Sequence, residues 1–464
     1  MFKPEIYQAR RTKIKNDLKN NGVLIFLGNN YSPMNYPANP YHFRQDSNFL
    51  YFFGLDKDGY NAIIDTDTGE EILFADELTI DSIIWMGPQP TVKEQAEKVG
   101  IKTTAPSAKF SEYIKNASDK GQKIHYLPPY RHENMMFLNS LLNIPFDKLK
   151  ENASVDFIKA IVKLRNIKED IEIAELGKAC NVGYLMHTTA MKMANPGVIE
   201  REIAGTIEGI SLSHGSIPSF PIILTKNGQT LHNHYHGNTL NEGNLLLVDA
   251  GAQTTMYYAS DNTRTMPVGG KFTQKQKDIY QIVLDAINKS IEIMKPGITY
   301  MSVHLYACEI LAEGLKSVGL MKGNVIEAVP KGAHALFMPH GLGHMMGLDV
   351  HDMEDLGQNY VGYSDEIDPS DTFGTAFLRM GRKLEKGHVL TNEPGIYFIP
   401  ELINLWKKER KFEEYINYDK VYEYLDFGGI RLEDAILITE NGAKIMGDKR
   451  IPITIEEVEN TMNS

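Results

Sequence analysis

Three histidines, His340, His344 and His351, stand in a glycine-rich segment at residues 338–352. Glycines at positions 341, 343 and 347 have no side chain to crowd a ligand, so the backbone could bring the imidazoles towards one point. Such a segment is typical of a site rather than of a core. The alternative is a glycine-rich surface loop whose histidines face water, because a local motif alone is only a hypothesis.

Two aspartates lie beside apolar segments that have the character of β-strands. Asp249 ends the apolar run at residues 245–248, and Asp261 follows twelve positions later in a run compatible with an antiparallel return strand. A hairpin of these segments would place the carboxylates side by side, where like charges repel unless a shared metal neutralises them. Each acid taken alone is more readily explained as a turn residue or a salt-bridge partner.

Two glutamates have the same character. Glu393 lies between an apolar strand and a Pro-Gly turn, and we expect Glu433 inside another strand with Arg431 on the same face. Oxygen-rich ligation with one nitrogen favours Mn²⁺ or a similar divalent ion over a thiolate-type zinc site, and five ligands with so much negative charge indicate two metal ions. The predicted ligand set has four carboxylates and one imidazole: Asp249, Asp261, His344, Glu393 and Glu433.

Composition limits the function classes. The chain has 464 residues, more than one core usually supports, so two domains are expected. With 48 basic and 60 acidic residues, the net charge of -12 gives no electrostatic footprint for nucleic acid or an anionic membrane. No signal-type segment or bilayer-spanning run is present, which predicts a cytoplasmic protein. Cys180 and Cys308 lie in apolar-periodic segments and are expected to be buried free thiols.

The elements that must position these residues fall into two regions. Short strands at residues 23–27, 61–64 and 72–74 alternate with helical patterns at 94–99 and 110–116, which predicts an α/β domain over residues 1–160. A long amphipathic pattern then runs from Val155 through Met193 and opens the second domain, at residues 161–464.

The second domain contains a weak internal sequence repeat. Pro196-Gly197 and Pro296-Gly297 each close one long helical pattern and open another, one hundred positions apart. Duplicated halves would produce a pseudo-symmetric domain with a site between them. Two unrelated helix-stop signals are the alternative, because Pro-Gly sequences commonly occur where helices end.

In this order, the five ligand segments resemble metallopeptidases of the pita-bread fold, specifically the proline-specific branch of aminopeptidase P and prolidase. Residues 43–54 are similar to the N-domain signature of that branch, and residues 164–173 resemble the start of its catalytic domain. The resemblance implies an α/β N-terminal domain of the creatinase/prolidase type. It also implies an α+β pita-bread catalytic domain with pseudo-two-fold halves.

The resemblance implies a role for each ligand. Asp249 would hold one metal ion, His344 and Glu393 the other, and Asp261 and Glu433 would bridge the two ions, which are expected to be Mn²⁺. Glu393 would also accept a proton from the attacking water and relay it to the leaving proline nitrogen.

Other residues match positions around the metals. His340 and His351 match histidines that contact the substrate and stabilise the tetrahedral oxyanion. His232 matches a histidine that leans over the scissile bond. Arg431 matches an arginine that orients a metal-bound acid, although an ordinary salt bridge is the alternative. His234 and His236 match no functional position and are expected at the surface or behind the site.

Two features concern the length of the substrate. Arg379 falls where prolidases place the arginine that recognises the free carboxylate of proline, and residues 398–427 resemble a prolidase segment. Asp46 and its neighbours match the aminopeptidase P pattern better. We expect an Xaa-Pro aminopeptidase acting on proline-containing peptides, with Xaa-Pro dipeptidase as the alternative. An inactive pita-bread module that binds peptides is the alternative from another class, and the resemblance also implies a homodimer.

Overall fold

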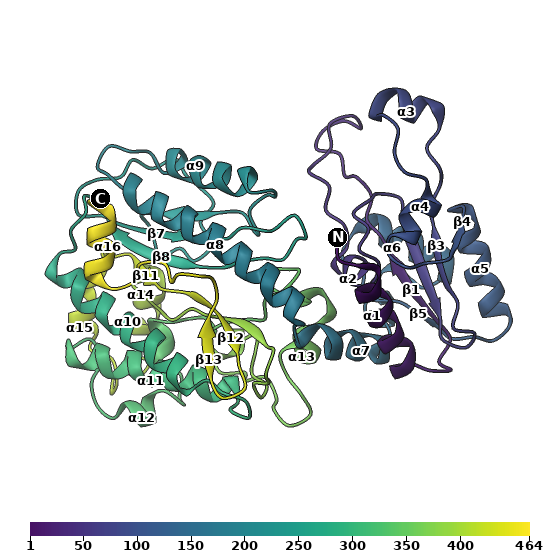
Figure 1. The fold of residues 1–464 in the computed structure, drawn as a ribbon. Coiled ribbons are helices and arrows are strands. Elements are labelled where there is room, and N and C mark those ends of the chain that lie inside the picture. The colour runs from purple at the N-terminus through teal and green to yellow at the C-terminus, as the bar shows by residue number, and fades with distance from the viewer. The chain divides into compact units, whose positions relative to one another are not determined.

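The computed structural model describes residues 1–464, which form two compact units (Figure 1). Unit 1 comprises Met1–Arg165 and Asp355–Tyr360, and unit 2 comprises Asn166–Glu354 and Val361–Ser464. The division after Arg165 lies near the boundary expected at residue 160. The short segment Asp355–Tyr360 groups with unit 1, which the sequence did not indicate.

Unit 1 is built on a five-stranded sheet in the order β4-β3-β2-β1-β5. The three central strands pair antiparallel, and the two edge strands are parallel to their neighbours. The strands are β1 (Val23–Leu27), β2 (Asn61–Asp65), β3 (Glu71–Phe74), β4 (Thr103–Ala105) and β5 (Ile124–His125). The three strands predicted from the sequence are therefore confirmed.

The remaining regular structure of unit 1 is helical. The helices are α1 (Pro4–Asp17), α2 (Ser47–Phe53), α3 (Ile80–Met86), α4 (Val92–Glu97), α5 (Ala108–Asp119), α6 (His132–Leu142), η1 (Phe146–Lys148) and α7 (Val155–Asn166). Phe26 of β1 packs edge-on against Phe53 and Phe157, with ring centroids 5.1 and 5.2 Å apart, so β1 lies in the core of the unit.

The prediction of a single long helix from Val155 to Met193 is wrong, because a short non-helical segment separates α7 from α8 (Asp170–Met193). Lys168 lies in the break, and its ammonium group forms a fully buried ion pair with Asp352 at 2.9 Å. Glu169 and Glu172 then form a capping box that starts α8 afresh. Hydrophobic periodicity continues across the break, which is why the pattern alone could not reveal it.

Unit 2 consists of two similar halves (Figure 1). The first has α8 and α9 (Glu200–Ser213) with an antiparallel sheet of β6 (Ile223–Thr225), β7 (Leu245–Asp249) and β8 (Thr263–Pro267). The second has α10 (Gln274–Ile293) and α11 (Tyr300–Ser317) with a sheet in the order β13-β12-β9 and a ribbon of β10 and β11. These strands are β9 (Val389–Asn392), β10 (Gly395–Tyr397), β11 (Gly429–Arg431), β12 (Asp434–Ile438) and β13 (Ala443–Ile445).

The two Pro-Gly signals are built alike. The amide of Gly197 donates to the carbonyl of Leu240 at 2.8 Å, and the amide of Leu240 donates to the carbonyl of Val198 at 2.8 Å. Gly297 and Leu384 form the same reciprocal pair at 2.9 and 2.8 Å, and both glycines have φ of +90°. This shared geometry supports duplicated halves over two unrelated helix stops.

Shorter elements complete unit 2: α12 (Val325–Ala328), η2 (Ala333–Leu336), η4 (Thr375–Phe377), α14 (Pro400–Lys408), α15 (Tyr418–Val421), η5 (Tyr422–Tyr424) and α16 (Ile455–Met462). Two further short elements, η3 (Glu354–Leu356) and α13 (Gln358–Val361), fall mostly within the segment that groups with unit 1. Cys180 and Cys308 are buried and unpaired, as expected. No helix combines the length and the apolar character needed to cross a membrane.

Candidate metal centre

The hairpin of β7 and β8 places two of the predicted ligands. Asp249 is the last residue of β7 and lies opposite Thr263, the first residue of β8. Asp261 precedes β8 by two positions, and Asp249 is near enough to contribute to the raised pKa of its carboxyl group. The expected hairpin therefore forms and brings the two acids together at one end.

Glu393 and Glu433 come from connections between sheets. Glu393 joins β9 to β10, as expected. The expectation that Glu433 lies inside a strand is wrong: β11 ends at Arg431 and β12 begins at Asp434. Because β11 pairs with β10 whereas β12 pairs with β9, the chain changes sheet at Glu433. Its amide donates to the carbonyl of Thr263 at 3.0 Å, which ties the junction to the β7–β8 hairpin.

The glycine-rich segment runs beside β9. The amide of His344 donates to Oγ1 of Thr391 at 3.1 Å, and the amide of Thr391 donates to the carbonyl of His344 at 2.9 Å. A Cβ atom on Gly343 would lie 2.2 Å from the carbonyl oxygen of Thr391. Close backbone packing therefore requires a glycine at this position, a reason that the sequence did not indicate.

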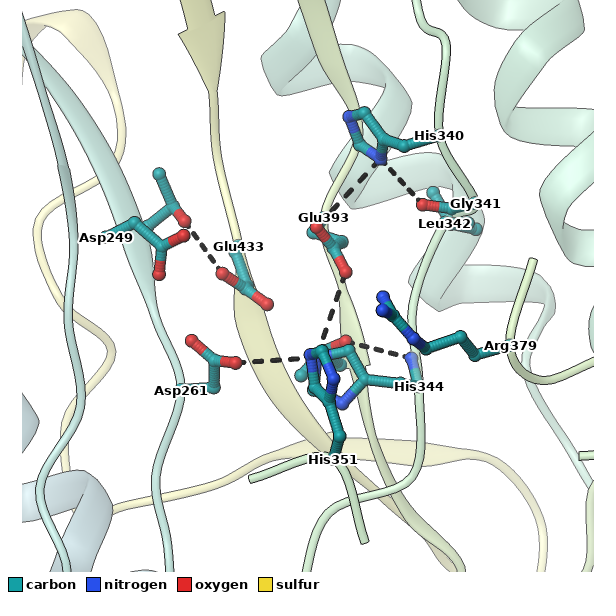
Figure 2. Close-up of polar contacts among 12 residues, drawn as sticks. Asp249, Asp261, His340, Gly341, Leu342, His344, His351, Arg379, Glu393 and Glu433 are labelled. Carbon is teal, nitrogen blue, oxygen red and sulfur yellow. Dashed lines mark hydrogen bonds and ion pairs between the residues drawn. The ribbon is translucent and has the colours of Figure 1, made fainter. Parts of the chain in front are cut away.

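All five predicted ligands face a common centre (Figure 2). Nε2 of His344 lies 3.4 Å from Oδ2 of Asp261 and 3.9 Å from Oε1 of Glu393. Ligand atoms of Asp261, His344 and Glu433 all lie within 4.8 Å of one another. Residues up to 184 positions apart in the chain, from Asp249 to Glu433, thus converge on one point.

His344 presents its unprotonated nitrogen to the acids. Its Nδ1–H donates to the carbonyl of Met345 at 3.1 Å, which fixes the tautomer and leaves the Nε2 lone pair facing Asp261 and Glu393. Burial, together with nearby His351, holds the pKa of His344 well below its usual range. The ring is therefore neutral, which is the state that binds a metal.

The acids repel one another. Burial, followed by the charges of Glu433, Asp249 and Glu393, raises the pKa of Asp261 well above its usual range. Burial, followed by the charges of Glu393 and Asp249, raises the pKa of Glu433 well above its usual range, and burial raises that of Glu393 to about 7. Oδ1 of Asp249 and Oδ1 of Asp261 have no hydrogen-bond partner although both atoms are buried. This excess of negative charge with orphaned oxygens fits divalent cations.

Arg431 links the centre to a tyrosine that sequence reasoning missed. The Arg431 guanidinium donates to Oδ2 of Asp249 at 2.5 Å and to the hydroxyl of Tyr397 at 3.0 Å. That hydroxyl lies 2.9 Å from Nε2 of His340, whose Nδ1–H donates to the carbonyl of Gly341 at 2.8 Å. His340 lies 4.0 Å from Glu393, and both of its nitrogens are already engaged.

Glu354 is a second residue that sequence reasoning missed. Its carboxylate lies 2.5 Å from Nδ1 of His351 and 3.4 Å from the guanidinium of Arg379. The hydrogen bond from His351 lowers the pKa of Glu354 to about 2. The only sequence signal was its spacing three residues after His351, which does not distinguish it from a surface acid.

The centre opens into a cavity of about 500 Å³. His232 and Arg379 line the cavity, as does His234, whose side chain is exposed at the surface. His236 instead donates from Nε2 to the carbonyl of Ile222 at 3.1 Å and does not line it. Apolar side chains form much of the remaining wall: Phe220, Ile223, Leu231, Val350 and Phe377.

Two family models match the chain. Residues 7–125 match the "Aminopeptidase P, N-terminal domain" and residues 174–440 match "Metallopeptidase family M24". A probable Xaa-Pro aminopeptidase of Fusarium vanettenii is 32% identical over 454 residues, covering 97% of this chain and 92% of the relative. The Xaa-Pro dipeptidase of Homo sapiens is 31% identical over 433 residues, covering 90% of this chain and 84% of the relative.

Solved structures of aminopeptidases are similar to the chain over its whole length. Aminopeptidase P from Escherichia coli matches with a TM-score of 0.81 at 28% identity, covering 100% of this chain and 98% of that chain. An aminopeptidase of Pseudomonas aeruginosa matches with a TM-score of 0.82 at 24% identity, which bears on the fold alone. The expected fold class, an α/β N-terminal domain and a pita-bread catalytic domain, is confirmed.

Proposed function

The chain belongs to metallopeptidase family M24, and we propose that it is an Xaa-Pro aminopeptidase, which removes the residue preceding proline from the amino terminus of a peptide. It is a metallo-exopeptidase, as the resemblance in its sequence implied. The observation that carries the proposal is the convergence of four carboxylates and the unprotonated nitrogen of His344 along one cavity.

Membership of this family, together with the clustered acids, implies divalent metal ions. We infer that there are two and that Mn²⁺ is preferred, because the donor set is rich in carboxylate oxygen and has no sulfur. Asp249 would hold one ion, His344 and Glu393 the other, and Asp261 and Glu433 both. When bound, such ions supply Lewis-acid polarisation and lower the pKa of water at the site.

Glu393 is the proton carrier in this proposal. Its carboxyl group borders the cavity, and burial tunes its pKa to about 7 in the metal-free protein. A group of this kind accepts the proton of the attacking water and passes it to the proline nitrogen as the peptide bond breaks. His344 holds no proton to give, because its Nδ1–H is committed to Met345.

Three histidines surround the scissile bond. His351 keeps Nε2 free of protein partners because Glu354 takes Nδ1, so it is placed to contact the carbonyl oxygen of the substrate. His232 borders the cavity from the first half of the unit. His340 has both nitrogens engaged, so its contribution to oxyanion binding requires it to exchange its bond to Gly341 for one to the substrate.

Substrate length depends on Arg379. A dipeptidase must bind the free carboxylate of proline, for which a guanidinium on the cavity wall is suited. Arg379 lines the cavity, but it is already paired with Glu354, and its side chain is 40% exposed. This partial neutralisation favours the aminopeptidase. The presence of Arg379 in the cavity and the 31% identity to a human Xaa-Pro dipeptidase keep the dipeptidase as the second candidate.

The deciding experiment compares hydrolysis of Xaa-Pro dipeptides with that of Xaa-Pro-Xaa tripeptides and longer peptides in the presence of Mn²⁺. We expect the longer peptides to be cleaved at least as well as the dipeptides. Cleavage confined to dipeptides would assign the chain as an Xaa-Pro dipeptidase. A matched peptide with alanine in place of proline controls for general aminopeptidase activity.

The peptide-binding module is the remaining alternative. It requires a protein that holds no metal and gains no peptidase activity from Mn²⁺, because hydrolysis at this centre depends on the ions. A cytoplasmic location and a homodimer stay predictions from the sequence.

A further inference from the structure

A second cluster of metal-binding side chains lies in unit 2, apart from the carboxylate centre. His304 and Cys308 are one turn apart on α11, and His334 belongs to η2. Ligand atoms of all three lie within 4.8 Å of one another. Sγ of Cys308 is 3.7 Å from Nε2 of His304, and the three side chains are buried.

The His334 ring is unusual for a buried polar group. Neither of its nitrogens makes a hydrogen bond, although the backbone of Val329 lies near. Most buried polar atoms in proteins are paired, because burying one without a partner is costly. His125, a histidine of similar burial in unit 1, has both nitrogens paired, with Ser154 and the carbonyl of Asn21.

The hydrogen bonding of His304 is also weak. Its polar neighbours are the sulfur of Cys308 and the hydroxyl of Thr375, which lies 3.4 Å from Nε2. Three potential ligands thus share a buried space in which ordinary hydrogen bonds do not satisfy them. A metal ion would satisfy all three at once.

The protonation states suit a cation. Burial lowers the pKa of His304 to about 3 and that of His334 to about 4, so both rings are neutral and keep a lone pair. Burial raises the pKa of the Cys308 thiol, so the thiol keeps its proton unless a cation replaces it.

We propose that His304, Cys308 and His334 form a site for one thiophilic metal ion of the zinc class. On binding, the Cys308 thiol releases its proton to solvent and the resulting thiolate forms a bond to Zn²⁺. Zinc–nitrogen and zinc–sulfur bonds of about 2.0–2.3 Å place neighbouring ligand atoms roughly 3.3–3.8 Å apart around a tetrahedral ion. The Cys308–His304 separation already meets this requirement, and Thr375 or a water supplies the fourth ligand.

This donor set has a preference opposite to that of the carboxylate centre. Two imidazoles and a thiolate select Zn²⁺ or Co²⁺, whereas four carboxylates and one imidazole suit Mn²⁺. An ion here would fasten α11 to η2, which ends four residues before His340. The site is therefore structural, and it braces the segment that leads to the cavity.

The test uses Co²⁺ as a spectroscopic probe. A fully buried site acquires its metal while the chain folds, so the protein is produced in medium containing Co²⁺ and then equilibrated with Mn²⁺ to occupy the carboxylate centre. We expect a near-ultraviolet charge-transfer band from a cobalt–thiolate bond. The carboxylate centre contains no sulfur and cannot produce such a band.

The two cysteines provide a matched control. Cys308→Ser should lose the band and one cobalt ion per chain, whereas Cys180→Ser, at the other buried thiol, should retain both. His334→Gln keeps the thiol but should lower cobalt retention by about tenfold or more, since it removes a ligand. It keeps the test informative if Cys308→Ser fails to fold. Absence of the band from the wild-type protein, or its persistence in Cys308→Ser, would overturn the proposal.

Discussion

The guanidinium of Arg431 donates a 2.5 Å hydrogen bond to Oδ2 of Asp249, while Oδ1 of the same carboxylate has no hydrogen-bond partner. One oxygen of Asp249 is thus fixed by the protein and the other is available to a cation. Both side chains are largely buried, so solvent does not screen this pair as it would a surface salt bridge.

Arg431→Lys should weaken Mn²⁺ binding by about 10- to 100-fold, because a lysine ammonium cannot reproduce the guanidinium that donates to Asp249 while it is held by Thr263 and Tyr397. Isothermal titration of the metal-free variant with Mn²⁺ measures the effect. Tyr397→Phe is the matched control, since it breaks the link from Arg431 to His340 but leaves the Asp249 contact intact. Equal Mn²⁺ affinity in Arg431→Lys and wild type would show that Asp249 does not depend on the arginine.

Glu393→Gln should lower kcat by about 10²- to 10⁴-fold, because the amide keeps the shape of the side chain but cannot carry a proton. The assay is cleavage of an Xaa-Pro-Xaa peptide at saturating Mn²⁺, which separates the loss of proton transfer from weaker metal binding. Metal content is measured on the same sample. A variant that retains wild-type turnover would remove Glu393 from the mechanism.

Asp261→Asn should stabilise the metal-free protein increasingly as the pH rises above about 4. The folded-state pKa of Asp261 is raised, so its stabilising contribution is full below the unfolded pKa of about 3.9 and is lost as the pH rises through the folded value. Thermal unfolding in EDTA measures the difference in Tm between variant and wild type. A difference in Tm that stays constant with pH would contradict the mutual repulsion of the four acids. Added Mn²⁺ should reverse the difference, so that the wild type has the higher Tm.

Glu354→Gln should lower kcat/KM for a tripeptide by about tenfold, because it weakens the charge-assisted hydrogen bond to His351 and frees Arg379. The same change should improve the ratio of dipeptide to tripeptide cleavage, since an unpaired Arg379 can bind the carboxylate of proline. Steady-state kinetics on both peptides provide the measurement. An unchanged ratio would mean that Glu354 does not restrain Arg379.

Much of the centre could be predicted because its ligands stand at the ends of short apolar strands. Asp249 and Glu393 occupy the expected ends, and the hairpin that carries Asp261 forms. The predicted position of Glu433 inside a strand was wrong because the chain changes sheet after β11. That change depends on long-range strand pairing, which the local alternation of apolar and polar residues does not encode.

Tyr397 and Glu354 were missed for a related reason. Tyr397 acts through contacts with Arg431 and His340, 34 and 57 positions away in the chain. Glu354 is near His351 in sequence, but only the structure reveals its contact with Arg379. The break after α7 was likewise hidden, because the buried pair of Lys168 and Asp352 joins residues 184 positions apart.

The most direct test of the account is titration of the metal-free protein with Mn²⁺, followed in parallel by bound metal and by cleavage of an Xaa-Pro-Xaa peptide. From the carboxylate centre we predict that two Mn²⁺ ions bind per chain and that activity rises as they bind. The Asp261→Ala variant should lose both Mn²⁺ binding and activity. A wild-type protein that binds no Mn²⁺ and gains no peptidase activity would contradict it.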